Sequence, residues 1–322
     1  MNAHTASARA PRLAPQASPF AADVLEGLSR QPKQLSPKYF YDAAGSELFE
    51  QITAQPEYYP TRVELGILRA REREIAAIIP QGAALVEFGA GSTTKARLLL
   101  RHGRVTAYVP VDISGEFVTA QAANLRRDFP HLRVAPVIAD FTAPFTLPEA
   151  VKAVPKVGFF PGSTLGNFEP QEAAAFLRGA RRILGAGAGL LLGVDLEKDD
   201  RTLHAAYNDA AGVTARFNLN LLTRINRELG GNFDLAGFAH RAIYNRERHR
   251  VEMHLVSRKA QTVRILGKSI AFREGESIHT ENSYKYSIAR FNALAEGAGW
   301  TPRRSWTDDE GLFSVHALVA ST

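Results

Sequence analysis

The chain has 322 residues, 45% of them hydrophobic and 22% charged, which is the composition of a globular protein with one large or two smaller cores. No apolar run approaches the ~20 residues of a membrane-spanning helix, and the absence of cysteine excludes disulfides, thiolate metal sites and cysteine nucleophiles. The net charge of +6 could attract nucleic acid, but arginines and acids are interleaved, which favours a solvated basic surface.

The N-terminal residues predict no folded element. Residues 1–22 are rich in alanine, proline and serine, contain no acid and lack the apolar core of a secretory signal. We predict that residues 1–19 form a disordered tail. We further expect a cytoplasmic monomer with no nucleic-acid and no membrane partner.

The middle third of the chain alternates between strand and helix patterns. Short apolar runs predict strands, and apolar residues on one face of a helix predict the segments between them. The predicted strands are 84–88, 107–112, 133–139, 156–160 and 189–195, and the predicted helices are 93–102, 115–127 and 171–184. This alternation predicts a parallel sheet with helices on both faces.

The pattern changes after Asp195. Residues 201–229 predict helical structure, residues 240–257 predict strands around a possible hairpin at YNRERHR, and residues 262–287 alternate in places. A helix over 288–298 and a terminal antiparallel hairpin, TPRRSW and FSVHALVA, complete the chain.

The simplest fold is an α/β protein with a seven-stranded doubly wound sheet, interrupted by an inserted α+β domain. The five strands of the middle third and the terminal hairpin form the predicted sheet. We expect residues 61–200 and 288–322 to form the domain of this sheet, and residues 20–60 and 201–287 to form the inserted domain.

The segment VEFGAGSTTK, residues 86–95, follows the first predicted strand and opens a helix. Gly89 and Gly91 let the backbone approach a ligand, and the helix N-terminus offers free N–H groups. A dinucleotide fingerprint needs a third glycine, where this chain has Thr94, so a tight turn explains the glycines equally well. The acid Glu87, just before the glycines, suits a ligand that carries an ammonium group better than a pyrophosphate.

Two further strands also end in acids. Asp112 ends the second strand, 23 residues after Gly89, where an acid can accept hydrogen bonds from a ribose diol. Asp140 ends the third strand and can accept from an adenine amino group, and Phe141 can pack on the ring. Each acid alone is more often a helix cap. Together they predict a site for an adenosine with a positively charged tail, which S-adenosylmethionine fits better than NAD or ATP. The terminal hairpin also suits the seven-stranded doubly wound sheet of a class I methyltransferase, so we expect the sheet domain to bind S-adenosylmethionine and the inserted α+β domain to be the substrate domain.

The sequence resembles the ergothioneine-pathway L-histidine Nα-methyltransferases over residues 23–320. The resemblance rests on long, uncommon segments: KYFYDAAGSELFEQITAQPEYYPTR (38–62), LVEFGAGSTTK, PGSTLGN, AYNDAAGVTARFNLNLLTRINREL (206–229), VEMHL (251–255) and TENSYKY (280–286). It implies that S-adenosylmethionine methylates the α-amino group of histidine three times to give hercynine, in the first step of ergothioneine biosynthesis, and that S-adenosylhomocysteine is the coproduct.

The resemblance also implies site residues, matched position by position. The cofactor residues would be Tyr41, Gly89, Lys95, Asp112, Asp140 and Phe141. The substrate residues would be Tyr58, Gly162, Asn167, Tyr207, Met253, Glu281 and Ser283. Tyr41, Tyr58 and Met253 could instead be core residues, which is the commoner role of such side chains.

The resemblance gives each end of the substrate its own contacts. Glu281 and Ser283 would bind the imidazole, while Asn282 and Tyr284 should face away if the segment is extended. The PGSTLGN turn, through Gly162 and Asn167, would hold the α-amino and carboxylate groups of histidine. Neutral groups such as Asn167 and Tyr207 would suffice there without a buried cation. No side chain is assigned as a catalytic residue, since methyl transfer to an amine needs alignment more than a nucleophile.

Two other functions remain open at this point. The first is a methyltransferase that acts on another amino acid or small amine. The second is a basic α/β protein that binds nucleic acid or a protein partner without catalysis, against which the acid-bearing strand ends argue. The histidines show no metal-ligand spacing on a single helix, so we expect no metal.

Overall fold

The computed structural model describes residues 18–321, and the chain divides into two compact units. The first unit comprises the described residues up to Ile52, with Ala210–Ala242 and Glu252–Glu281. The second unit comprises Thr53–Asp209, Ile243–Val251 and the described residues from Asn282 onward. Most of the predicted N-terminal tail lies outside the described residues, and Ser18 caps the first helix. The predicted division into a cofactor domain and a substrate domain stays a prediction.

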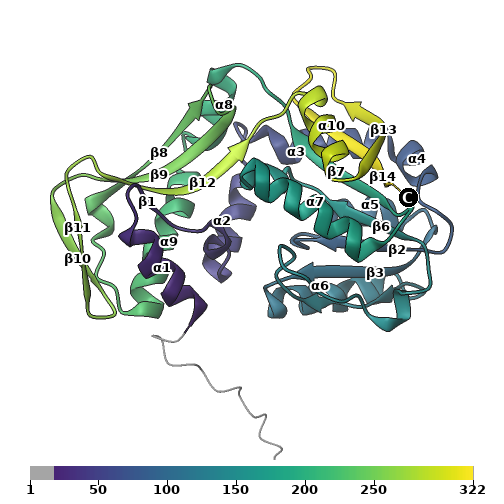
Figure 1. Cartoon of the computed structure of the whole chain (residues 1–322), viewed down its shortest axis with the longest axis horizontal. Helices are drawn as coiled ribbons and strands as arrows, with labels where there is room; N and C mark the ends of the chain where they lie inside the picture. The colour runs from purple at the N-terminus through teal and green to yellow at the C-terminus, as the bar shows by residue number, and fades with distance from the viewer. Residues whose placement is uncertain (1–17, 322) are drawn as a thin grey trace, which may run out of the picture. The chain divides into compact units, whose positions relative to one another are not determined.

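The second unit is built on one eight-stranded sheet, in which β14 runs antiparallel to β7 and to β13 (Figure 1). The strands pair in the order β13-β14-β7-β6-β2-β3-β4, with β5 beside β3. They are β2 (Ala83–Phe88), β3 (Val105–Asp112), β4 (Arg133–Val134), β5 (Val137–Ile138), β6 (Lys156–Phe160), β7 (Gly189–Asp195), β13 (Trp300–Thr307) and β14 (Phe313–Ala320). Because β2, β3, β6 and β7 are parallel, their carboxyl ends meet at one edge. The predicted α/β class and doubly wound sheet are confirmed.

The eighth strand arises because the predicted strand 133–139 is two short strands, β4 and β5. Pro136 lies between them, and proline has no N–H to donate to a ladder. The helical structure predicted over 201–229 is divided between α8 (Asp200–Tyr207) and α9 (Val213–Leu229), with residues 208–212 between them. Gly212, whose φ is 67°, is the N-cap of α9.

Helices cover both faces of this sheet, and each face has its own core. On one face, α7 (Pro170–Leu184) and α10 (Ile288–Gly297) pack Phe176 and Phe291 against strand residues such as Val86. On the other face, buried side chains come from α3 (Tyr59–Ala70), α4 (Glu72–Ala77), α5 (Thr94–Leu100) and α6 (Gly115–Asp128). Alternate side chains of each central strand serve the two cores, which is why these strands are almost wholly apolar.

A smaller sheet, most of which belongs to the first unit, has the strand order β1-β12-β9-β8 (Figure 1). The strands are β1 (Lys33–Gln34), β8 (Phe238–Asn245), β9 (Arg250–Ser257) and β12 (Ser277–Tyr284), and β10 (Gln261–Ile265) and β11 (Lys268–Phe272) form a separate hairpin. The boundary between the units falls inside β8, β9 and β12. The unit also contains α1 (Pro19–Ser29), nearly all of α2 (Ala43–Thr53), and α9.

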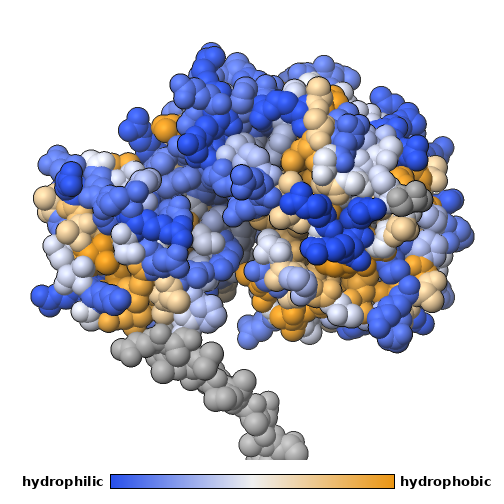
Figure 2. All heavy atoms as spheres, in the orientation of Figure 1, coloured by the Kyte–Doolittle hydropathy of each residue, from blue (hydrophilic) through white to orange (hydrophobic). Residues whose placement is uncertain are grey.

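On the face shown in Figure 2, hydrophilic residues form most of the surface of each unit, and apolar residues form smaller patches. Among residues 18–321, no helix combines the length and apolar character required to cross a bilayer.

A buried histidine in β14 predicts acid sensitivity of the second unit. His316 is 1% exposed, and burial lowers its pKa to about 4. Between pH 6.5 and 4 the unfolded chain binds a proton that the folded chain does not, so the free energy of unfolding falls as pH falls. We expect His316 to contribute about 3 kcal/mol to this fall, at ~1.4 kcal/mol per pKa unit. Denaturant titrations across this window should show a shallower fall for His316→Gln, and parallel curves would contradict the prediction.

Candidate active site

The turn after β2 brings backbone close to an aromatic ring. Gly89 has a φ of +70°, and a Cβ at this position would lie 3.2 Å from the Phe141 ring. Its N–H and that of Ala90 donate to the carbonyl of Val111, which fixes the turn against β3. Gly91, by contrast, has open space where a Cβ would stand. The structure therefore requires glycine at 89 and not at 91.

The two acids at the neighbouring strand ends hold short turns. Asp112 Oδ1 accepts from the Ser114 N–H at 2.8 Å, and Asp140 Oδ1 accepts from the N–H and hydroxyl of Thr142. Burial raises the pKa of Asp112, against the lowering effect of the backbone N–H groups that it accepts from. Asp112 pairs in register with Ile138 of β5, so the two predicted cofactor acids lie at adjacent strand ends.

Glu87, the acid before the glycines, is buried beside a tyrosine. It is 2% exposed, and its carboxyl accepts a hydrogen bond from the hydroxyl of Tyr108. Burial raises the pKa of Glu87 to about 7, although Tyr108 and the charge of Lys95 oppose the shift.

A buried ion pair joins the β2 turn to the turn after β6. Glu64 of α3 is 1% exposed and pairs with Lys95, the predicted cofactor residue at the start of α5. Both Glu64 oxygens also accept from the Gly162 N–H, at 3.0 and 2.9 Å. One carboxylate therefore fixes a predicted cofactor residue and a predicted substrate residue together.

The PGSTLGN turn is tightly built. Gly162 and Ser163 both have positive φ, 82° and 56°, and the Ser163 hydroxyl accepts from the Asp195 N–H at 2.9 Å. A Cβ on Gly166 would lie 2.8 Å from the carbonyl oxygen of Tyr284. The glycine at 166 thus lets the turn lie directly on the backbone at the end of β12. Asn167 ends the 3-10 helix η4 (Thr164–Asn167).

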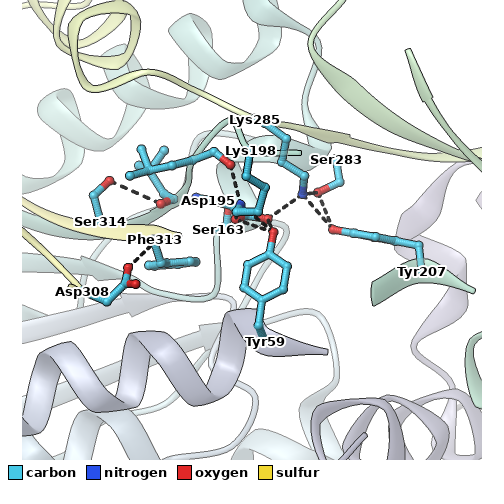
Figure 3. A network of polar contacts seen from close by, with 12 residues as sticks. Tyr59, Ser163, Asp195, Lys198, Tyr207, Ser283, Lys285, Asp308, Phe313 and Ser314 are labelled. Carbon is cyan, nitrogen blue, oxygen red and sulfur yellow. Dashed lines mark hydrogen bonds and ion pairs between the residues drawn. The ribbon is translucent and has the colours of Figure 1, made fainter. Parts of the chain in front are cut away.

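Asp195, at the carboxyl end of β7, is surrounded by two lysines and a tyrosine (Figure 3). It is 1% exposed and accepts from Lys285, Lys198 and the Tyr59 hydroxyl at 2.6 to 2.9 Å. Burial raises the pKa of Asp195, but the two lysine charges outweigh it and hold the pKa below its usual value. Burial lowers the pKa of Lys198 to about 8.

Two predicted substrate residues meet this network. The Tyr207 hydroxyl donates to the Ser283 hydroxyl at 2.7 Å, and Lys285 donates to both, at 2.9 and 2.7 Å. The ring of Tyr58 lies edge-on to that of Tyr207, with centroids 6.3 Å apart. The expectation of a neutral site at Tyr207 was wrong, because a fully buried ammonium contacts its hydroxyl.

The residues between these positions face another partner. Asn282 and Tyr284 both donate to the carboxylate of Glu169, which also pairs with Arg250 at 2.6 Å. Ser283 contacts Tyr207 and Lys285 instead. The predicted alternation along 282–284 is therefore confirmed.

Three predicted site residues belong to the first unit. Tyr41 is 37% exposed and lies edge-on to the rings of Phe49 and Phe217. Met253 is buried in β9, and its carbonyl accepts from the Thr280 hydroxyl. Glu281 is a half-buried residue of β12. Their roles at the site stay predictions.

Comparison with known proteins assigns the chain to a family. The profile described as "Histidine-specific methyltransferase, SAM-dependent" matches residues 20–320. The chain belongs to this family. The histidine N-alpha-methyltransferase of Mycobacterium tuberculosis is 42% identical over 91% of this chain and 92% of the relative, and that of Mycolicibacterium smegmatis is 42% identical over 92% and 94%. Ergothioneine biosynthesis protein 1 of Neurospora crassa is 30% identical over 90% of this chain. The match covers 33% of that longer protein.

The second unit of this methyltransferase has groups that fit an adenosine. Asp112 offers carboxylate oxygens at the strand edge, and Ile113 and Ile138 beside it are 48% and 65% exposed, unusual values for isoleucine. Gly89 leaves the approach to the Phe141 ring open. A carboxylate that can accept hydrogen bonds from a diol, beside exposed apolar side chains, fits the adenosine part of S-adenosylmethionine. Within residues 18–321, no cluster of three or more histidines and acids is arranged to hold a metal.

Sequence reasoning missed four buried residues of this methyltransferase. Glu64, Asp195, Lys198 and Lys285 are each at most 5% exposed in their side chains. One signal was available: Lys285 continues the two-residue spacing of Glu281 and Ser283 along an extended segment. Nothing in the sequence pairs Glu64 with Lys95, because their contact depends on how α3 packs on the sheet.

Proposed function

We propose that this protein methylates the α-amino group of L-histidine with S-adenosylmethionine, three times in succession, to give hercynine in the first step of ergothioneine biosynthesis. The observation that carries the proposal is the 42% identity, over more than nine tenths of both chains, to mycobacterial histidine N-alpha-methyltransferases. The histidine-specific family profile supports the same substrate.

We assign the cofactor to the carboxyl edge of the large sheet. Asp112 would accept hydrogen bonds from the ribose diol, Asp140 would accept from the adenine amino group, and Phe141 would pack on the ring. Gly89 and Lys95 would contact the amino-acid end, together with Tyr41. The cofactor supplies an electrophilic methyl group on a sulfonium.

We assign the amino-acid end of histidine to Asn167, Gly162, Tyr58 and Tyr207. Each methyl transfer forms an N–C bond as a C–S bond breaks, and the nitrogen must present a lone pair. Model α-amino groups have a pKa of ~7.7–8.0, so a neutral fraction exists near pH 8. The chain's contribution is alignment of the amine with the methyl group, which can supply ~7–11 kcal/mol of the barrier.

The remaining assignments follow the family resemblance. Ser283 and Glu281 would bind the imidazole, and Met253 would line its site. The cytoplasmic location, the monomeric state, and the absence of a metal, a nucleic-acid partner and a membrane partner stay predictions.

Product analysis tests the proposal directly. Incubation with S-adenosylmethionine and histidine near pH 8 should yield mono-, di- and trimethylated histidine by mass spectrometry. The alternative is a methyltransferase for another amino acid or small amine, so the other standard amino acids should be offered in competition. Methylation of one of these in preference to histidine would replace the proposed substrate, and no methylated product between pH 7 and 9 would refute the activity.

A further inference from the structure

The ammonium of Lys285 uses all of its hydrogen-bonding capacity inside the protein (Figure 3). Its side chain is fully buried, and Nζ lies 2.7 Å from Asp195 Oδ2, 2.9 Å from the Tyr207 hydroxyl and 2.7 Å from the Ser283 hydroxyl. A lysine ammonium has three donors and no acceptor. Each of these three oxygens therefore accepts a hydrogen bond from Lys285.

The direction of the remaining hydrogen bond follows. Tyr207 donates its own proton to the Ser283 hydroxyl at 2.7 Å, as expected because a phenol is more acidic than an alcohol. Ser283 Oγ thus accepts from both Lys285 and Tyr207. A hydroxyl has two lone pairs and one proton, so both acceptor positions of Ser283 are occupied. Its only remaining capacity is to donate.

We infer that Lys285 is a positioning residue that makes Ser283 a hydrogen-bond donor, so that the site selects the neutral imidazole of histidine over the imidazolium. The inference rests on the proposed function, in which the imidazole contacts Ser283. A neutral imidazole has one acceptor nitrogen, whereas an imidazolium has none. The buried positive charge of Lys285 acts in the same direction, because charge repulsion is strong where water is excluded. The carboxylate of Glu281, which the proposed function also places at the imidazole, can accept the N–H of the neutral ring; its charge favours the imidazolium and opposes that of Lys285, so the hydrogen-bond direction at Ser283 decides the selection.

Binding measurements on the unmodified protein test this inference. Histidine and its isostere 1,2,4-triazol-3-ylalanine are titrated by calorimetry into protein saturated with S-adenosylhomocysteine, from pH 5.5 to 8.5. The triazole keeps an N–H and an acceptor but stays neutral across this range. Because the two ligands carry the same α-amino and carboxylate groups, the ratio of their dissociation constants isolates the ring.

We expect the ratio of the histidine to the triazolylalanine constant to rise about tenfold between pH 8 and pH 5.5, since imidazole has a pKa of ~6.5. A ratio that stays constant would overturn the inference and leave the proposed function standing. Failure of both ligands to bind at pH 8 would refute the proposed function and the inference with it.

Two lysine variants separate positioning from general stabilisation. Lys285→Met removes the donor to Ser283, while Lys198→Met removes the other lysine on Asp195 without touching Tyr207 or Ser283 in the contacts above. With Lys285→Met, Ser283 regains an acceptor position, so the acid-dependent change in the ratio should fall from about tenfold to less than threefold. With Lys198→Met, the tenfold change should persist.

Equal loss of the pH dependence in both variants would show that the Asp195 network as a whole is responsible, and would overturn the role of Lys285. The role of Lys285 would also be overturned if, in Lys285→Met, the ratio of the histidine to the triazolylalanine dissociation constant still rose tenfold between pH 8 and pH 5.5. Thermal unfolding of both variants identifies any that fail to fold, in which case the measurement on the unmodified protein decides alone.

Discussion

Replacement of Asp195 by asparagine is expected to lower the free energy of unfolding by about 3–5 kcal/mol, the usual cost of leaving a buried charge without its partner. The asparagine side chain would leave those of Lys198 and Lys285, 5% and 0% exposed, beside an uncharged group. The amide N–H groups would also face the lysine donors. Denaturant titration at pH 7 measures the loss.

The same variant should behave differently with pH and with a second substitution. Burial lowers the pKa of Lys198 to about 8 even with Asp195 beside it, so in Asp195→Asn this pKa falls further and the lysine loses its proton below pH 8. The stability gap to the parent should therefore narrow as the pH rises towards 8 and stay constant above it. Asp195→Asn combined with Lys198→Met should be more stable than Asp195→Asn alone. A single variant within about 1 kcal/mol of the parent, or no gain in the double variant, would contradict this account.

Replacement of Glu64 by alanine is expected to disturb both the cofactor and the substrate turns. It removes the charge that pairs with Lys95 and the acceptor of the Gly162 N–H, so stability should fall by about 3–5 kcal/mol. Because Lys95 loses the partner that holds it, we expect S-adenosylhomocysteine to bind at least tenfold more weakly. Calorimetry and denaturant titration measure the two effects.

Glu64→Gln is the matched control for this substitution. The amide oxygen can still accept from the Gly162 N–H, while the charge that pairs with Lys95 is lost. We therefore expect a smaller loss of stability than for alanine but a similar loss of cofactor affinity. If both variants bind S-adenosylhomocysteine as tightly as the parent, the ion pair of Glu64 with Lys95 does not contribute to cofactor binding.

The sheet could be predicted closely because its strands are short apolar runs with strong boundaries. The predicted strands 156–160 and 189–195 coincide with β6 and β7, since both are buried on two faces and end at polar turns. The departures came from local breaks within otherwise regular patterns. Pro136 lies between β4 and β5, and residues 208–212 lie between α8 and α9; the periodicity around each break outweighed it in the prediction.

The fold class and the family could be read from the sequence alone, as could the turns predicted to bind ligands, because these depend on local patterns and long uncommon segments. Which side chains neutralise one another depends on the tertiary structure. Glu64 lies 31 residues from Lys95, and Asp195 lies 90 residues from Lys285. A buried charge is tolerable only beside an opposite one, and that partner is supplied by packing between elements that the sequence leaves far apart.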